Sequence, residues 1–310
     1  MAADLMFHFT FLIYTVFVTT TLTLKLHHSV LLSSSITKSN FDIVLLHGLL
    51  GSARNFNSFA RLLHQKLEYE HNIIIIDLPS HGRSASTHRE VLEYTSLAED
   101  VIETLDYLSI DKVHVIGHSM GGKIASTLAI YHPHRVRSLG ILDISPVEYR
   151  PEEFSTVSQL IQRLDAIDIR KQQLKDRNAA QSYLVSSIED QSMIPFLMSN
   201  LQMNELGLLD WKFNLTTIVK SMSNVMDFPS PAESPPFEGP LLLIKGSRSN
   251  FVVSKHLNMI KSMFKQYTIV SIKDCGHWVH AEKPEEASEL LKTFVKRFDK
   301  AGSRDYVASS

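Results

Sequence analysis

The strongest chemical signal in the sequence is a serine within a glycine-rich pentapeptide, Gly117-His118-Ser119-Met120-Gly121. It directly follows an apolar run at 113–116 and directly precedes a segment with helical spacing at 123–131. A serine on a tight strand-to-helix turn presents its hydroxyl at the end of the strand, and small neighbours let strand and helix pass closely. A glycine-rich turn without chemistry accounts less well for this placement. We therefore expect Ser119 to be the nucleophile of an acyl-transfer reaction.

A second glycine-containing loop, His47-Gly48-Leu49-Leu50-Gly51, follows the apolar run at 43–46. Acyl transfer generates an oxyanion, which backbone N–H groups stabilise when they point at it. We expect the N–H groups of Leu49 and Met120 to form this oxyanion hole, with the amino end of the helix after Ser119 adding the positive end of its dipole. His47 is expected to brace the loop rather than to transfer protons.

The general base is expected C-terminal to the nucleophile, and His277 is the best-placed histidine. It lies in Asp274-Cys275-Gly276-His277-Trp278, between the apolar run at 268–272 and the final helical segment. This position puts it at the same edge of the sheet as Ser119. Structural roles are favoured for His118 and His280. Cys275 is interpreted as a packing residue, because no strained turn presents its thiol.

Several carboxylates could supply the acid that orients His277. The segment after the apolar run at 241–244 is Lys245-Gly246-Ser247-Arg248-Ser249-Asn250, which holds no carboxylate. The preceding run, 139–142, ends directly before Asp143, next to the strand that carries Ser119. We therefore expect Asp143 to orient His277 and keep the second candidate, Asp274, as the alternative. Asp77 is expected to order the loop that follows it.

Short apolar runs alternate with helical segments along most of the chain. The four- to five-residue length and β-branched content of the runs indicate strands buried on both faces, as in a parallel sheet. Alternation of strand and helix predicts a doubly wound α/β fold with a mostly parallel sheet. The expected strands are 43–46, 73–76, 113–116, 139–142, 241–244 and 268–272, and the clearest helices are 56–67, 96–108, 123–131 and 285–298.

One long segment interrupts the alternation of strands and helices, because residues 143–240 separate two consecutive expected strands. This segment is far longer than one crossover helix needs, which predicts an inserted and mostly helical cap. The expected organisation is an α/β core at 41–146 and 238–300, a cap at 147–237 and a C-terminal tail at 301–310. Aromatic and methionine side chains in the cap indicate either an acyl-binding wall or the cap's own core.

Composition narrows the classes of function. Lys and Arg total 31 against 33 Asp and Glu, so the overall charge does not favour nucleic acid as a partner. The 15 histidines are scattered rather than arranged as a metal-binding array, and no metal or cofactor is expected. Cys275 is the only cysteine, so no disulfide can form within the chain.

The N-terminal segment 1–40 supports two interpretations. Residues 5–24 contain no Asp, Glu, Lys or Arg and are long enough to span a bilayer, which favours an anchor, a secretory signal or another membrane association. Asp4 and the lack of an early basic residue argue against a secretory signal. The other interpretation places one or two early strands of the fold at 21–36.

At these motifs the chain resembles the α/β-hydrolase domain-containing protein 11 family and related short-chain bacterial esterases. The resemblance runs from about residue 42 to residue 298 and implies an α/β-hydrolase fold, the triad Ser119, Asp143 and His277, and ester or thioester hydrolysis. For eukaryotic members it implies a mitochondrial address, although the Arg-rich presequence is missing here. The matching stretches are 47–52, 55–57, 81–84, 117–123, 143–148 and 276–284.

Together these observations predict a serine hydrolase that cleaves small-molecule carboxylic esters or thioesters, including acyl or lipid substrates, through an acyl-enzyme. The alternative is a non-hydrolytic ligand-binding or protein-regulating module on the same fold. The fold also hosts lyases and cofactor-free peroxidases, so the fold does not by itself define the reaction.

Overall fold

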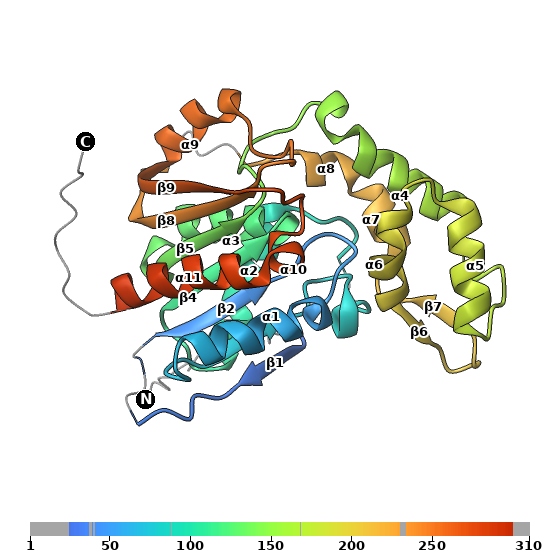
Figure 1. Cartoon of the computed structure of the whole chain (residues 1–310), viewed down its shortest axis with the longest axis horizontal. Coiled ribbons are helices and arrows are strands. Elements are labelled where there is room, and N and C mark those ends of the chain that lie inside the picture. Colours follow the sequence, from blue (N-terminus) through green and yellow to red (C-terminus); the bar gives the residue numbers. More distant parts are fainter. Residues whose placement is uncertain are drawn as a thin grey trace, which may run out of the picture.

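The computed structural model describes residues 25–36, 39, 41–87, 89–167, 169–229 and 234–299 as an α/β core with a cap at one edge (Figure 1). The central sheet has the strand order β1-β3-β2-β4-β5-β8-β9. Only β1 runs antiparallel to its neighbour, and the other pairs are parallel. The strands are β1 (His28–Leu31), β2 (Asp42–Leu46), β3 (Ile73–Ile76), β4 (Val113–His118), β5 (Val136–Leu142), β8 (Phe237–Gly246) and β9 (Phe264–Ile272).

Helices cover both faces of this sheet, as the alternating sequence pattern predicts. The front face in Figure 1 carries α1 (Ala53–Lys66) and α11 (Pro284–Asp299), and their apolar side chains form one buried cluster with the sheet. The other face carries α2 (Tyr94–Tyr107) and α3 (Met120–Tyr131), whose cluster continues into the cap. The strands are buried on both faces because of this sandwiching, which explains their unbroken apolar runs. The shorter α9 (Leu257–Met263) precedes β9, and α10 (Val279–Glu282) precedes α11.

The residues between β5 and β8 form the cap, which lies beyond the carboxyl ends of the parallel strands (Figure 1). A two-stranded antiparallel hairpin, β6–β7, interrupts the helices and was not expected from the sequence. Its strands are three residues long, too short for an alternating pattern to identify. The cap elements are α4 (Ser155–Ile167), α5 (Arg177–Ser187), α6 (Ile194–Ser199), β6 (Leu201–Met203), β7 (Leu209–Trp211), α7 (Leu215–Lys220) and α8 (Met222–Met226).

A buried lysine joins the cap to the core. Lys123 of α3 is 1% exposed, and its Nζ donates to the carbonyl oxygens of Val225 (3.3 Å), Met226 (3.0 Å) and Asp227 (2.7 Å). An ammonium group has three N–H donors, so these bonds use all of them. The end of α8 is therefore tied to the helix that follows Ser119.

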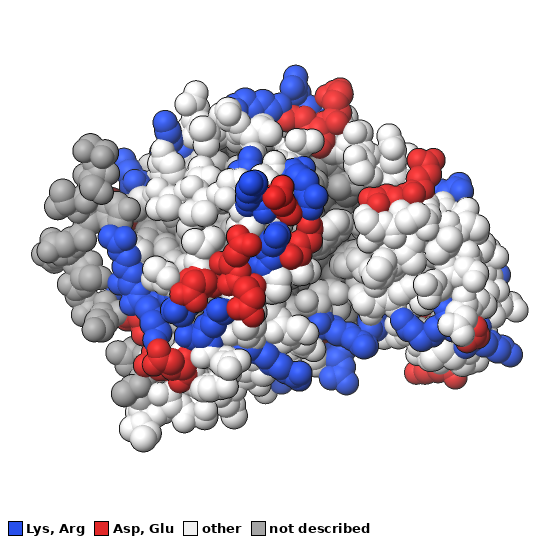
Figure 2. Space-filling model, viewed as in Figure 1, with Lys and Arg blue, Asp and Glu red and all other residues white. Residues whose placement is uncertain are grey.

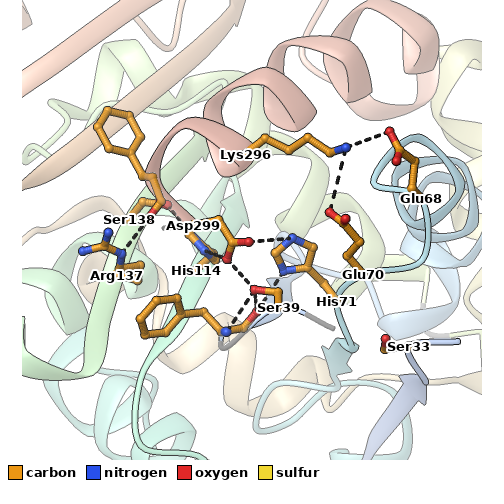
Figure 3. A network of polar contacts seen from close by, with 12 residues as sticks. Ser33, Ser39, Glu68, Glu70, His71, His114, Arg137, Ser138, Lys296 and Asp299 are labelled. Carbon is orange, nitrogen blue, oxygen red and sulfur yellow. Dashed lines mark hydrogen bonds and ion pairs between the residues drawn. The ribbon is translucent and has the colours of Figure 1, made fainter. Parts of the chain in front are cut away.

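A polar network ties the last helix to the opposite end of the sheet (Figure 3). The carboxylate of Asp299 accepts a hydrogen bond from Ser39 and lies 3.8 Å from His71 Nε2 and 3.6 Å from His114 Nε2. On the same helix, Lys296 pairs with Glu68 at 2.8 Å. This network lies at the amino ends of the strands, away from the edge that holds the predicted site, and we assign it to docking of α11.

All six strands expected from the sequence are present, so the predicted fold class is confirmed. The antiparallel strand β1 falls within the 21–36 range expected to supply early strands. The apolar segment 5–24 and the tail 301–310 lie outside the described residues. Within the described part of the chain, no helix combines the length and apolar character needed to span a bilayer.

Packing of α1 on the sheet gives a stability prediction. Leu63 is fully buried between α1 and the sheet, so Leu63→Ala should lower the free energy of unfolding by about 2–5 kcal/mol through lost burial and a residual cavity. Ser58→Ala on the exposed side of the same helix should change it by less than about 0.5 kcal/mol. Denaturant unfolding of both variants measures the difference. Equal effects would contradict the packing described here.

Candidate active site

Ser119 lies on a strained turn between β4 and α3. Its backbone φ is 52°, in the left-handed region that side chains other than glycine rarely adopt. Close backbone packing surrounds the turn: a Cβ at Gly121 would lie 2.3 Å from the carbonyl oxygen of Leu46, and a Cβ at Gly117 would lie 2.1 Å from that of Gly121. Only glycine fits at these two positions, which explains the spacing of the motif. Strain of this kind is typical of functional sites.

His277 and Asp143 are joined by a hydrogen bond. His277 Nδ1 donates to Asp143 Oδ2 at 2.8 Å, with the Asp143 side chain fully buried and that of His277 18% exposed. Asp143 comes directly after β5, and His277 comes from the loop between β9 and α10. A carboxylate at Nδ1 holds the ring so that Nε2 is free to accept a proton. The alternative acid, Asp274, is exposed, and no hydrogen bond joins it to His277.

Two hydrogen bonds from the end of β8 and the loop after it, a segment that itself has no carboxylate, hold Asp143. The N–H of Gly246 donates to Asp143 Oδ1 at 2.9 Å, and the hydroxyl of Ser249 donates to Oδ2. Hydrogen bonds of this kind stabilise the charged form of a buried carboxylate. Neither donor was predicted from the sequence, because a backbone N–H and a serine hydroxyl carry no signal of their own in segment 245–250.

Ser119 and His277 line the same cavity, so the structure brings the expected nucleophile and base together. Among the described residues, no hydrogen bond joins the Ser119 hydroxyl to the His277 ring. In free enzymes such bonds are commonly long and tighten when substrate binds. The arrangement is suited to acyl transfer: a serine on a strained turn, a histidine that lines the same cavity and a buried carboxylate bonded to that histidine.

The cavity has a volume of about 410 Å³ and lies between the strand ends and the cap. Its walls are mainly apolar, and side chains from the helical part of the cap contribute to them. Such a surface suits an acyl chain better than a sugar or a nucleotide base. The apolar lining residues include Leu49, Leu50, Phe154, Val157, Leu160, Met193, Pro195, Phe196, Val225 and Trp278.

The predicted oxyanion-hole residues, Leu49 and Met120, both line this cavity. Within the described part of the chain, neither backbone N–H donates a hydrogen bond, so both groups remain available to a ligand. Met120 is the first residue of α3, where helix N–H groups lack partners within the helix. A Cβ at Gly48 would lie 3.1 Å from that of Ser119, which places the loop beside the nucleophile. Their role as oxyanion donors remains a prediction.

Two buried histidines brace the loop after β2, which contains Leu49 and Leu50. His47 Nε2 accepts from the N–H of Leu78 at 3.0 Å, and His81 Nε2 accepts from the N–H of Leu50 at 3.1 Å. A ring nitrogen that accepts a hydrogen bond carries no proton, so both rings are neutral in this arrangement. Burial, the largest cause, lowers the pKa of His47 and lowers that of His81 to about 3. His47 thus braces the loop, as expected.

Two further buried histidines lie near His277. His118 Nε2 donates to the backbone carbonyl oxygen of His277 at 3.0 Å, and the His280 ring stacks on Phe56 with centroids 4.5 Å apart. Burial, followed by the nearby His280 and His277, holds the pKa of His118 well below its usual range. Burial and then His277 lower the pKa of His280 to about 3. Both residues are therefore neutral packing groups near neutral pH.

The remaining competitors do not form a second centre. Cys275 is buried, and burial, with smaller effects from Glu282 and Asp143, raises the pKa of its thiol to about 11, so the reactive thiolate is scarce at neutral pH. Asp77 accepts from the N–H groups of Ala53 and Arg83, and so orders the loop after it. In the described part of the chain, no group of three or more His, Cys, Asp or Glu side chains could hold a metal ion.

Comparisons with known proteins agree with this fold. Residues 43–284 match the family described as the alpha/beta hydrolase fold. Mouse sn-1-specific diacylglycerol lipase ABHD11 is 32% identical over 255 residues, which cover 82% of this chain and 80% of the mouse protein. Esterase YbfF of Escherichia coli is 30% identical over 257 residues, covering 83% of this chain and 94% of the bacterial one. A solved marine microorganism esterase superposes with a TM-score of 0.78 at 30% identity, covering 89% and 99% of the two chains.

The chain therefore belongs to the α/β-hydrolase family, and its similarity to ABHD11 confirms the resemblance expected from the motifs. The relatives carry the names of esterases and a lipase, which confirms the expected class of enzyme, a carboxylic ester hydrolase.

The buried histidines give a prediction about acid stability. His280 stays neutral in the folded protein but binds a proton in the unfolded chain below pH 6.5, so folding loses stability as pH falls from 6.5 towards about 3. At pH 5, about 1.5 units below 6.5, this residue alone should lower the free energy of unfolding by up to about 2 kcal/mol, because each pH unit contributes about 1.4 kcal/mol.

Denaturant unfolding at pH 7 and pH 5 tests this prediction. His280→Gln should lose less stability between the two pH values than the wild type, whereas His134→Gln, at an exposed position, should behave like the wild type. Identical pH dependence in all three proteins would show that His280 is not buried in its neutral form.

Proposed function

We propose that the protein hydrolyses carboxylic esters or thioesters through a covalent acyl-enzyme on Ser119. The observation that carries the proposal is the His277–Asp143 hydrogen bond of 2.8 Å, since His277 lines the same cavity as a serine on a strained turn. The esterase and lipase names of the relatives support it.

In the first half-reaction, His277 Nε2 removes the proton from the Ser119 hydroxyl while the oxygen attacks the substrate carbonyl carbon. The carbonyl oxygen gains the negative charge and is held by the N–H groups of Leu49 and Met120. The tetrahedral intermediate then breaks its bond to the alcohol or thiol, which takes the proton from His277. Ser119 remains as an ester of the acyl group.

In the second half-reaction, water replaces the departed alcohol or thiol. His277 takes one proton from the water, whose oxygen attacks the acyl carbon, and the second tetrahedral intermediate releases the acid. Ser119 recovers its proton from His277. Asp143 stabilises the protonated ring in both halves without itself becoming protonated.

The apolar cavity supports an acyl group as the part of the substrate held next to Ser119. The name of the mouse relative, a diacylglycerol lipase, supports acyl esters of lipids as one substrate class. Membrane association through residues 5–24 and a mitochondrial address belong to this proposal, and both concern a segment outside the described residues.

A non-catalytic ligand-binding or regulatory role is the competing interpretation, since the fold alone does not establish turnover. The free N–H groups of Leu49 and Met120 favour hydrolysis, because a pocket that only binds apolar ligands does not require them. A fluorophosphonate that labels Ser119, together with turnover of p-nitrophenyl butyrate, supports the enzyme. Labelling without turnover of any ester would favour the binding role.

Ser119→Ala should lower kcat for p-nitrophenyl butyrate by at least about 10³-fold, because the nucleophile and its acyl-enzyme are lost. The denaturation midpoint should stay near that of the wild type, since a hydroxyl is exchanged for hydrogen at a partly exposed position. Steady-state kinetics and thermal unfolding measure the two quantities. A Ser119→Ala protein with wild-type kcat refutes the assignment.

Asp143→Asn should lower kcat by roughly 10⁴-fold with little change in KM, because an amide no longer holds the ring of His277 in the productive tautomer. Asp274→Asn is the matched control and should retain wild-type kcat, since Asp274 is exposed and does not contact His277. If Asp274→Asn instead shows the large loss, the acid has been assigned to the wrong residue.

A further inference from the structure

Two cations hold the carboxyl end of the cap helix α6. Lys212 Nζ donates to the carbonyl oxygen of Ser199 at 2.8 Å. Arg177 donates to the carbonyl oxygens of Met198 and, at 3.3 Å, Leu201. Positive side chains at the carboxyl end of a helix complement its free carbonyl groups. This role uses one donor of Lys212 and two of Arg177, which leaves other N–H groups of both side chains free.

A third cation, Arg54, has no such structural role. It is exposed near the beginning of α1 and makes no hydrogen bond or ion pair with another described residue. Its charge nevertheless acts on Lys212: burial, then Arg54 and Arg177, hold the pKa of Lys212 below its usual value. Blue side chains gather below the hollow between core and cap in Figure 2, over the region where α1 begins.

Among the residues that the structure describes, no carboxylate pairs directly with any of these three cations. Within the described residues, none of Arg54, Arg177 and Lys212 forms an ion pair, and Asp77 has only the smallest effect on the pKa of Lys212. Asp176, next to Arg177, accepts a hydrogen bond from the N–H of Ala179 at the start of α5. Cations that repel one another without a counter-charge favour binding of an external anion.

The cations adjoin the wall of the active-site cavity. Pro195 and Phe196 of α6 line that cavity, and Lys212 and Arg177 bind carbonyl oxygens at the end of the same short helix. Asn55, the residue after Arg54, also lines the cavity, and its side chain donates to Ser199 Oγ at 3.1 Å. An anionic group bound by these cations would therefore lie beside the cavity. It would belong to the part of a substrate that extends out of the cavity.

We propose that Arg54, Arg177 and Lys212 form an anion subsite that binds a phosphate group on the leaving alcohol or thiol of the substrate. The inference rests on the proposed function, since it names the substrate class of the same site. The acyl chain occupies the apolar cavity, and the phosphate-bearing portion extends across the end of α6. Guanidinium groups suit this role because their paired N–H donors match the oxygens of a phosphate.

Phosphate can reach this subsite on two kinds of leaving group, a phosphorylated glycerol or a phosphorylated thiol. The first experiment compares butyryl-coenzyme A with the butyryl thioester of N-acetylcysteamine, which has the same thioester without phosphate. The second compares 1-octanoyl-glycerol-3-phosphate with 1-octanoylglycerol. We expect the wild type to show a lower KM for the phosphate-bearing member of at least one pair, and that pair identifies the source.

Arg54→Ala should raise the KM for the preferred phosphate-bearing substrate about fivefold, the size expected for one exposed ion pair, and leave kcat nearly unchanged. Arg54→Lys should restore part of the loss, and Arg54→Glu should enlarge it. None of the three should alter the kinetics of the matched neutral ester. High salt should reduce the preference in the wild type, since exposed charges are screened.

Arg61→Ala is the matched control, because Arg61 is an exposed arginine two turns further along α1 that does not act on Lys212. It should retain the wild-type preference. The proposal is overturned if neither substrate pair shows a preference, or if Arg54→Ala and Arg61→Ala change it equally.

Binding of coenzyme A itself separates this proposal from the proposed function. If the phosphorylated thiol is the preferred source, calorimetry with the full-length Ser119→Ala protein should show binding of coenzyme A. Adding Arg54→Glu to that protein should weaken this binding. When the glycerol pair shows the preference, glycerol-3-phosphate replaces coenzyme A. Binding without turnover by the wild type would retain the subsite and refute the hydrolase. Turnover of neutral esters without anion binding would retain the hydrolase and refute the subsite.

Discussion

The left-handed backbone at Ser119 is the constraint on which the site depends. A serine is held there at a φ of 52°, and close contacts between main chains on either side of the turn keep it in place. Gly121 packs against the carbonyl of Leu46 on the neighbouring strand, so the turn is fixed by the sheet itself. The strain is offset by the buried core on both faces of the sheet, which is why a rigid α/β scaffold can hold it.

The arrangement of strand ends at this edge of the sheet explains how a carboxylate after β5 can reach His277 although the loop after β8 has none. Asp143 follows β5, yet its carboxylate is held by Gly246 at the end of the neighbouring strand β8 and by Ser249 in the loop after it. The parallel strands end side by side, so the loop after one strand can support a side chain from the next. The buried carboxylate at His277 Nδ1 comes from the end of β5, and the hydrogen bonds that hold it come from the end of β8 and the loop after it.

Local patterns predicted the elements and the candidate reactive side chains, because apolar runs and glycine spacing report short-range packing directly. Ser119 followed from its flanking strand and helix, and Asp143 followed from the missing carboxylate in 245–250. Three features were not predictable in this way: the β6–β7 hairpin, the hydrogen bond from Ser249 to Asp143, and the hydrogen bonds from Lys123 to the cap. The strands of the hairpin are only three residues long, whereas the contacts of Ser249 and Lys123 join residues far apart in the chain: Ser249 lies 106 residues from Asp143, and Lys123 lies 102 residues from Val225. A single sequence contains no signal for such pairings.

Lys123 also determines how the cap can contribute to specificity. It lies three residues after Met120, so the helix that is expected to supply an oxyanion donor also holds the last helix of the cap. All three of its donors are occupied by cap carbonyls, and it is therefore unable to bind a ligand although it borders the cavity. Burying this charge without those carbonyls would be unfavourable, so the end of α8 is held close to the helix that follows Ser119. Selectivity must then arise from the parts of the cap that remain free to vary, α4 and α6, whose apolar side chains line the cavity.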